Sequence, residues 1–105
     1  MKIKFKSTDD EILRFDNGSA ITFEHCQDCC EWNYADFDQI DDIALDHKFK
    51  EPLDFEKCNG GFRFGNKNKM VYVPCYSSQN GYYSNDIHIL YNGKEVLYLD
   101  DLEVI

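Results

Sequence analysis

Alternation of apolar and polar residues with a period of two is the feature that most constrains the fold of this 105-residue chain. Successive side chains of a β-strand point to opposite faces, so this period is typical of strands that bury one face. Ile3 and Phe5 alternate with lysines, and the runs EILRF and AITFEH flank Asn17-Gly18. An Asn-Gly pair in that setting predicts a hairpin with a type I′ turn, which needs positive φ at both central residues.

The same pattern returns in the C-terminal half. Residues 87–99, IHILYNGKEVLYL, contain a second Asn-Gly pair between two apolar runs, and residues 60–76 predict two further strands around a loop from Gly65 to Lys69. A chain of this length has the size of one domain. We therefore predict a mainly β fold, a single antiparallel β domain spanning residues 1–105 with about seven or eight strands. A barrel, a sandwich and a sheet covered by one helix all fit this pattern.

Residues 38–47 are the exception to the period of two. Ile40, Ile43 and Ala44 lie at i, i+3 and i+4, the spacing of one face of a helix. Asp38 is a suitable N-cap, and Pro52 closes the region. The sequence predicts at most one short helix, near residues 38–47.

The negative charge is concentrated in one third of the chain. The formal net charge is −9, and residues 24–56 contain two lysines against eleven acidic residues. Such a surface repels phosphate backbones, so we expect no nucleic-acid partner. A basic partner, a bound cation and simple solubility all fit the excess of carboxylates. Apolar runs fall short of the roughly 20 residues that cross a bilayer, so we expect no membrane partner and a cytoplasmic location.

Residues 25–31, HCQDCCE, gather thiols and an imidazole that could bind zinc. If the strand that begins at Ala20 continued straight to Tyr34, Cys26 and Cys30 would lie about 13 Å apart, too far for one metal ion. A zinc site therefore requires the chain to turn here and to recruit distant ligands. The candidate metal ligands are His25, Cys26, Cys29, Cys30, Cys58 and Cys75.

A reactive thiol and a buried sulfur are the two other interpretations of this segment. Cys29 and Cys30 lie between Asp28 and Glu31, and neighbouring carboxylates raise a thiol pKa and disfavour the nucleophilic thiolate. Unpaired cysteines are more often small buried apolar side chains. The charge pattern therefore favours a structural role over a thiol-dependent enzyme.

A second stretch, residues 76–86, combines Tyr, Ser, Asn and Gly, the composition of adaptable binding loops. Together with the first stretch it resembles a family of bacterial and phage proteins of unknown function, which carry an H-x-Q-D-C-C-E motif early and an S-N-G-Y-Y-S motif late. Gln79 stands where that family has serine, and Cys26 falls at the variable position of the first motif. The resemblance covers about residues 11–91 and implies a shared site formed by both motifs. The candidate binding residues are His25, Gln27, Asp28, Cys29, Cys30, Glu31, Asn80, Gly81, Tyr82, Tyr83 and Ser84.

The sequence thus predicts a small, non-enzymatic binding or interaction module of bacterial or mobile-element origin. Its partner would be an unidentified protein or small ligand that contacts the acidic middle of the chain and the loop containing Tyr82 and Tyr83. No cofactor is expected, zinc being the one alternative. A zinc-supported domain is the second hypothesis and a thiol-dependent enzyme the third, and the sequence leaves the oligomeric state open.

Overall fold

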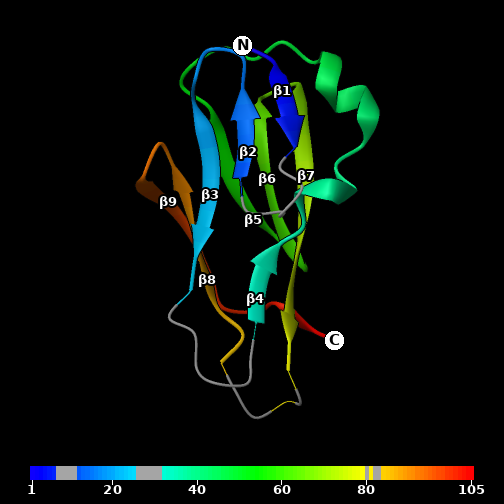
Figure 1. Cartoon of the computed structure of the whole chain (residues 1–105), viewed down its shortest axis with the longest axis vertical. Coiled ribbons are helices and arrows are strands. Elements are labelled where there is room, and N and C mark those ends of the chain that lie inside the picture. Colours follow the sequence, from blue (N-terminus) through cyan, green and yellow to red (C-terminus); the bar gives the residue numbers. More distant parts are fainter. Residues whose placement is uncertain (7–11, 26–31, 80, 82–83) are drawn as a thin grey trace.

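The computed structural model describes residues 1–6, 12–25, 32–79, 81 and 84–105, and within them the chain forms two five-stranded sheets (Figure 1). Every neighbouring pair in the first sheet is antiparallel. In spatial order this sheet contains β1 (Ile3–Lys6), β2 (Ile12–Phe15), β3 (Ala20–Glu24), β8 (Ile87–Tyr91) and β9 (Lys94–Leu99).

The second sheet is built around one long strand, β7 (Lys69–Ser78). Its N-terminal part pairs with β6 (Gly61–Asn66), which in turn pairs with β5 (Asp54–Cys58). Its C-terminal part pairs with β4 (Trp32–Ala35) and β10 (Glu103–Val104). Both of these strands pair with Tyr76 and Ser77, so they lie on opposite edges of β7.

The two sheets pack face to face as a sandwich, and they do not close into a barrel. Phe15 of the first sheet meets Phe64 of the second edge to face, with 5.9 Å between the ring centroids. The fully buried side chains come from both sheets and include Leu13, Phe15, Ile21, Phe62, Phe64, Val73, Cys75, Ile87, Ile89 and Leu99. The predicted mainly β fold is therefore confirmed.

The details depart from the sequence prediction in three ways. The described residues form ten strands instead of seven or eight, because β4 and β10 are short strands that add to the ends of the longer β7. The pairing of β10 with β7 is parallel, where the sequence predicted an antiparallel domain. The strand that begins at Ala20 ends at Glu24, and β4 belongs to the other sheet.

The helical segment consists of two 3₁₀ helices, η1 (Phe37–Gln39) and η2 (Asp42–Asp46), instead of one short helix. Their N-caps are Asp36 and Asp41, not Asp38, and each cap carboxylate accepts a hydrogen bond from the backbone amide two residues later. Ile43 is 69% exposed, so the i, i+3, i+4 pattern overstated the apolar face. Within the described ranges, no helix has the length and apolar character needed to cross a membrane.

The two ends of the sandwich differ in how the chain turns. At the end that we call the hairpin end, Asn92 and Gly93 both have positive φ, as a two-residue type I′ turn requires. The turn at Asn17-Gly18 differs from the prediction, because only Gly18 has positive φ and the Phe15 amide donates to the Ser19 carbonyl across a three-residue loop. At the opposite end, which we call the motif end, β3 and β7 finish and β4 and β8 begin.

Candidate functional site

A buried amide, that of Asn33, lies at the centre of the motif end. Asn33 points inward from β4 and is 2% exposed. Its Nδ2 donates to the carbonyl oxygens of Ser84, at 3.1 Å, and Asp86, at 2.7 Å, while its Oδ1 accepts from the hydroxyl of Ser77. Buried amides are tolerated when their hydrogen bonds are made, so this side chain fixes the segment that leads into β8 against β4 and β7.

His25 joins the same network from the end of β3. Asn33 Nδ2 lies 3.2 Å from His25 Nε2, and His25 Nδ1 lies 3.3 Å from Asp86 Oδ1. The other carboxylate oxygen of Asp86 accepts a hydrogen bond of 2.8 Å from the Tyr98 hydroxyl. Burial raises the pKa of Asp86, but hydrogen bonds from Tyr98 and Ser84 and the charge of His25 outweigh it, so this pKa lies below its ordinary value.

The structure thus brings one residue of each predicted motif, His25 and Ser84, to the same buried amide. Gln79, which differs from the serine that the sequence-based resemblance predicted, donates to the Ser77 hydroxyl at 2.6 Å and to the Ser84 carbonyl at 3.1 Å. Gly81 is exposed with φ +96°, and a side chain there would meet nothing within 4 Å. The other predicted residues lie outside the described part of the chain, namely Cys26, Gln27, Asp28, Cys29, Cys30, Glu31, Asn80, Tyr82 and Tyr83.

The two distant cysteines do not form a metal centre with the other described residues. No group of three His, Cys, Asp or Glu side chains among the described residues could hold a metal ion. Cys75 is buried in the core, where desolvation strongly raises the pKa of its thiol, and a zinc ligand must be a thiolate. Cys58 is half-buried at the end of β5. Zinc binding by Cys26, Cys29 and Cys30 stays a prediction.

An aromatic surface lies on the outer side of the second sheet, beside the buried network. Because Asn33 and Ala35 face the core, Trp32 and Tyr34 face outward from β4. Their rings are stacked, with centroids 4.3 Å apart and 24° between planes, and Tyr34 contacts Tyr76 of β7 at 5.8 Å. Trp32 remains 47% exposed. We call Trp32, Tyr34 and Tyr76 the aromatic surface.

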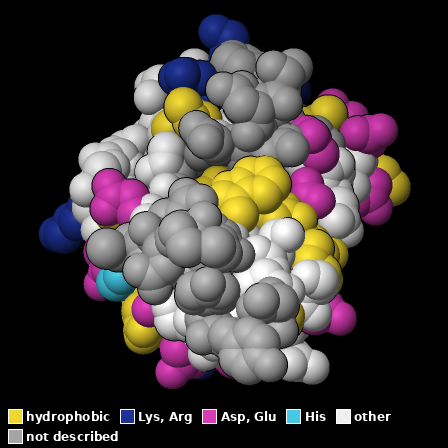
Figure 2. Space-filling model, turned by 60° about the horizontal axis from the view of Figure 1, so that its bottom comes forward, with side chains coloured by type: hydrophobic (Ala, Val, Ile, Leu, Met, Phe, Trp, Pro, Cys, Tyr) yellow, Lys and Arg dark blue, Asp and Glu magenta, His cyan; other side chains and the backbone are white. Residues whose placement is uncertain are grey.

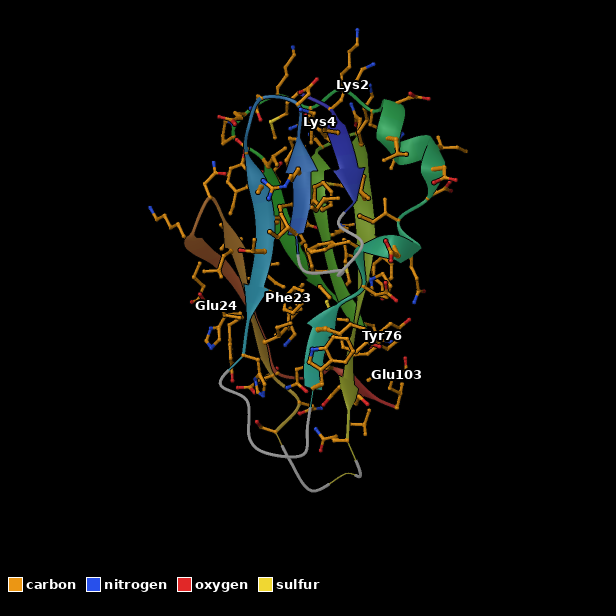
Figure 3. All side chains as sticks on the ribbon, in the orientation of Figure 1. Lys2, Lys4, Phe23, Glu24, Tyr76 and Glu103 are labelled. Atoms are coloured by element: carbon orange, nitrogen blue, oxygen red, sulfur yellow. The ribbon has the colours of Figure 1, made fainter. Side chains whose placement is uncertain are left out.

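Polar groups hold the two borders of this surface in place. Tyr76 donates to the Gln39 side-chain oxygen at 3.3 Å, and the Gln39 amide donates to Asp36 at 2.8 Å. On the other edge of β7, Glu103 is the register partner of Tyr76, and Figure 3 shows the two residues side by side. The aromatic surface therefore has a carboxylate on each side.

A groove continues the surface along β7 toward η2. Tyr72 lies on the same face of β7 as Tyr76 and is 46% exposed, and Ile43 of η2 is exposed opposite it. The groove is lined by Gln39, Asp41, Ile43, Ala44, His47, Met70, Val71 and Tyr72. Gln39 lines the groove and accepts a hydrogen bond from Tyr76, so the groove adjoins the aromatic surface.

Sequence reasoning missed both the centre of the network and the aromatic surface. The signal for the surface was present in the W-x-Y spacing of Trp32 and Tyr34, which places two large rings on one face of a strand. The signal for Asn33 was a polar residue between them. Nothing local linked either feature to Ser77, Asp86 or Tyr98, which lie more than forty residues away in the sequence.

Comparison with known proteins gives a family but no activity. A family model described as "Domain of unknown function (DUF7448)" matches residues 1–89, from β1 into β8. No curated protein and no solved structure matches.

Proposed function

Since the chain belongs to the DUF7448 family, whose function is unknown, we propose a function from the geometry: it is a non-enzymatic binding module whose ligand lies on the aromatic surface. The observation that carries this proposal is the stacked Trp32–Tyr34 pair, which leaves Trp32 47% exposed. The motif residues from Asp28 to Glu31 directly precede Trp32 in the sequence, and we include them in the same site.

The energetics of exposed aromatic rings support a binding role. Each Å² of apolar surface left in water forgoes about 25 cal/mol, so a large ring held at the surface gains its full stabilisation only when a partner covers it. Trp and Tyr are enriched among the residues that dominate binding energies. Stacking already restricts the rings of Trp32 and Tyr34, so a ligand loses little side-chain entropy on binding them.

The chemistry of the described polar groups supports a structural role for the buried network. The amide of Asn33 is occupied by two carbonyls and a hydroxyl, and the carboxylate of Asp86 accepts a hydrogen bond from Tyr98 and lies 3.3 Å from His25 Nδ1. Such a network positions the segments around the ligand site. We place the module in the cytoplasm, and we assign it a bacterial or mobile-element origin because of the two motifs.

The test selects ligands and then measures their affinity for a site variant and a matched control variant. Immobilised protein is screened against a random peptide library and a glycan array, and every ligand is then measured on Trp32→Ala and on His88→Ala. The side chain of His88 is 42% exposed, close to the value for Trp32, but lies on β8 of the other sheet. We expect ligands that lose about tenfold or more in affinity on Trp32→Ala and keep their affinity on His88→Ala.

Two results would contradict the proposal. One is a set of ligands that bind Trp32→Ala as well as they bind the natural chain. The other is the recovery of no ligand from either collection. Urea unfolding of both variants checks that they are folded at the screening temperature.

A further inference from the structure

The segment that leads from the aromatic surface into the groove carries charge of one sign. Residues 32–46, which run from Trp32 through η2, contain five aspartates and no lysine or arginine. On the face shown in Figure 2, an apolar patch lies at the centre with acidic side chains on its right, and further acidic and basic side chains lie at the margins of the face. Arg63, the register partner of Tyr72, is paired with Glu56 of the neighbouring strand. The surface is therefore suited to a positively charged ligand.

Asp36 places a carboxylate with a fixed orientation beside the aromatic surface. It lies two residues after Tyr34, just beyond the end of β4 at Ala35, and its backbone amide donates to the Pro74 carbonyl of β7 at 2.8 Å. One carboxylate oxygen of Asp36 accepts from the Asp38 amide at 3.2 Å and the other from Gln39 at 2.8 Å. A carboxylate has about four acceptor positions, so Asp36 keeps capacity for a ligand while its orientation is fixed.

Aromatic faces beside a fixed carboxylate are the environment that guanidinium groups prefer. The planar guanidinium of arginine stacks on aromatic rings and donates two parallel hydrogen bonds to a carboxylate, and lysine offers a compact charge for the same faces. Glu103, on the other side of Tyr76, adds a second carboxylate within the same row. A ligand with several cationic side chains could use both borders of the aromatic surface.

The length of the surface indicates an extended ligand. From Tyr72 to Ser78 the strand rises about 20 Å, and its outer face joins the groove beside η2 to the aromatic surface. A single small cation would contact only a fraction of this distance. An extended peptide of about six residues has the same reach.

We propose that the ligand of this module is an extended, positively charged peptide segment of another protein. Its arginine or lysine side chains stack on Trp32 and Tyr34 and pair with Asp36 and Glu103, and its remaining residues follow the outer face of β7 into the groove. This inference rests on the proposed function and gives its ligand a chemical class.

The experiment measures binding of a defined probe through Trp32, the only tryptophan of the chain. The probe is a peptide of alternating arginine and serine, about ten residues long to exceed the reach of the surface. A second peptide replaces each arginine with citrulline, which keeps the shape and removes the charge. We expect the arginine peptide to change Trp32 fluorescence and the citrulline peptide to bind at least about tenfold more weakly.

Charge variants test the role of Asp36. Asp36→Asn removes the charge but keeps an N-cap residue, so the fold is retained. The control is Asp54→Asn, which removes the same charge from β5, a strand separated from β7 by β6. We expect about fivefold weaker binding of the arginine peptide to Asp36→Asn, and less than about twofold to Asp54→Asn at 0.1 M salt, where the screening length is about 10 Å.

The outcomes separate this inference from the function on which it rests. Equal binding of the arginine and citrulline peptides, or equal effects of the two charge variants, overturns the cationic peptide. If the selected ligands still require Trp32 but are neutral glycans or uncharged peptides, the binding module stands and its ligand class is wrong. If the arginine peptide leaves Trp32 fluorescence unchanged and no selected ligand depends on Trp32, both proposals fail.

Discussion

The hairpin end and the motif end are held by hydrogen bonds of different burial. At the hairpin end, Glu51 accepts from the Tyr91 hydroxyl at 2.9 Å and from the Asn17 amide at 3.1 Å, both in contact with water. At the motif end, Asn33 is 2% exposed, its side-chain hydrogen bond with Ser77 is buried, and its bonds to the Ser84 and Asp86 carbonyls are partly buried. Both ends join segments that are distant in the sequence, so what separates them is access to water.

That difference decides which end is sensitive to the loss of one partner. A hydrogen bond in contact with water is replaced by water at a cost of about 1 kcal/mol or less. A buried carbonyl that loses its donor finds no replacement and carries the full cost of desolvation. The motif end is therefore specified by a small number of side chains, and the ligand site that we propose depends on the positions they set.

The largest expected effect comes from removing the buried amide. Asn33→Ala leaves the carbonyls of Ser84 and Asp86 and the hydroxyl of Ser77 without their partner, so the free energy of unfolding should fall by about 3 kcal/mol. The matched change at the hairpin end, Asn17→Ala, removes an exposed amide and should cost about 1 kcal/mol. Urea unfolding followed by circular dichroism measures both.

A double-mutant cycle tests whether Asn33 and Ser77 act together at the motif end. Ser77→Ala combined with Asn33→Ala should cost clearly less than the two single changes added, because Ser77 and Asn33 belong to one network. Additive costs, or a loss at Asn17 as large as that at Asn33, would show that burial does not distinguish the two ends.

The strands and turns could be predicted from the sequence because their signals are local. Alternation places residues on two faces, and the second Asn-Gly pair supplies the two positive φ angles of its turn. Alternation does not say which face is inside. On β4 the large rings of Trp32 and Tyr34 look like core residues, yet Asn33 is buried, because pairing with β7 places Asn33 opposite the inward Ser77.

The centre of the motif end could not be predicted for a related reason. The contacts of Asn33 with Ser77, Ser84 and Asp86 span 44, 51 and 53 residues. Such contacts exist only after two sheets have packed, and no local pattern encodes them.

The helical segment was predicted only in part from the sequence. The carboxylates of Asp36 and Asp41 each cap a short turn, and the apolar spacing alone suggested one continuous helix.

A backbone change gives a smaller effect and is confined to the hairpin end. Gly18 has φ +89°, and a Cβ atom there would meet nothing within 4 Å. Gly18→Ala should therefore cost only the strain of a positive φ, about 1 kcal/mol, and Gly18→Asn less, because asparagine tolerates this conformation better. Thermal unfolding of the two variants checks the order. Binding of the arginine peptide should be unaffected by both, and a loss of binding would mean that the ends are coupled.

The smallest expected effect is a difference in acid sensitivity between the ends. Hydrogen bonds from Tyr91 and Asn17 lower the pKa of Glu51, and the pKa of Asp86 is lowered despite its burial. A carboxyl whose pKa is depressed in the folded state stabilises the fold above its unfolded pKa, about 4, and this stability is lost as the pH falls through the folded pKa. Both ends should thus weaken below about pH 4.

Water screens the interactions of Glu51 more than those of Asp86. This difference predicts which of the two variants changes the pH dependence of stability more. The side chain of Asp86 is 26% exposed and faces His25, which is 8% exposed, whereas Glu51 is surrounded by water and its interactions are screened. Asp86→Asn should flatten the pH dependence of the unfolding free energy, measured by urea unfolding between about pH 5 and pH 2, more than Glu51→Gln does. The reverse order would place the more strongly coupled carboxyl at the hairpin end. The buried network would then be held by its neutral hydrogen bonds, with the contact between His25 and Asp86 contributing little.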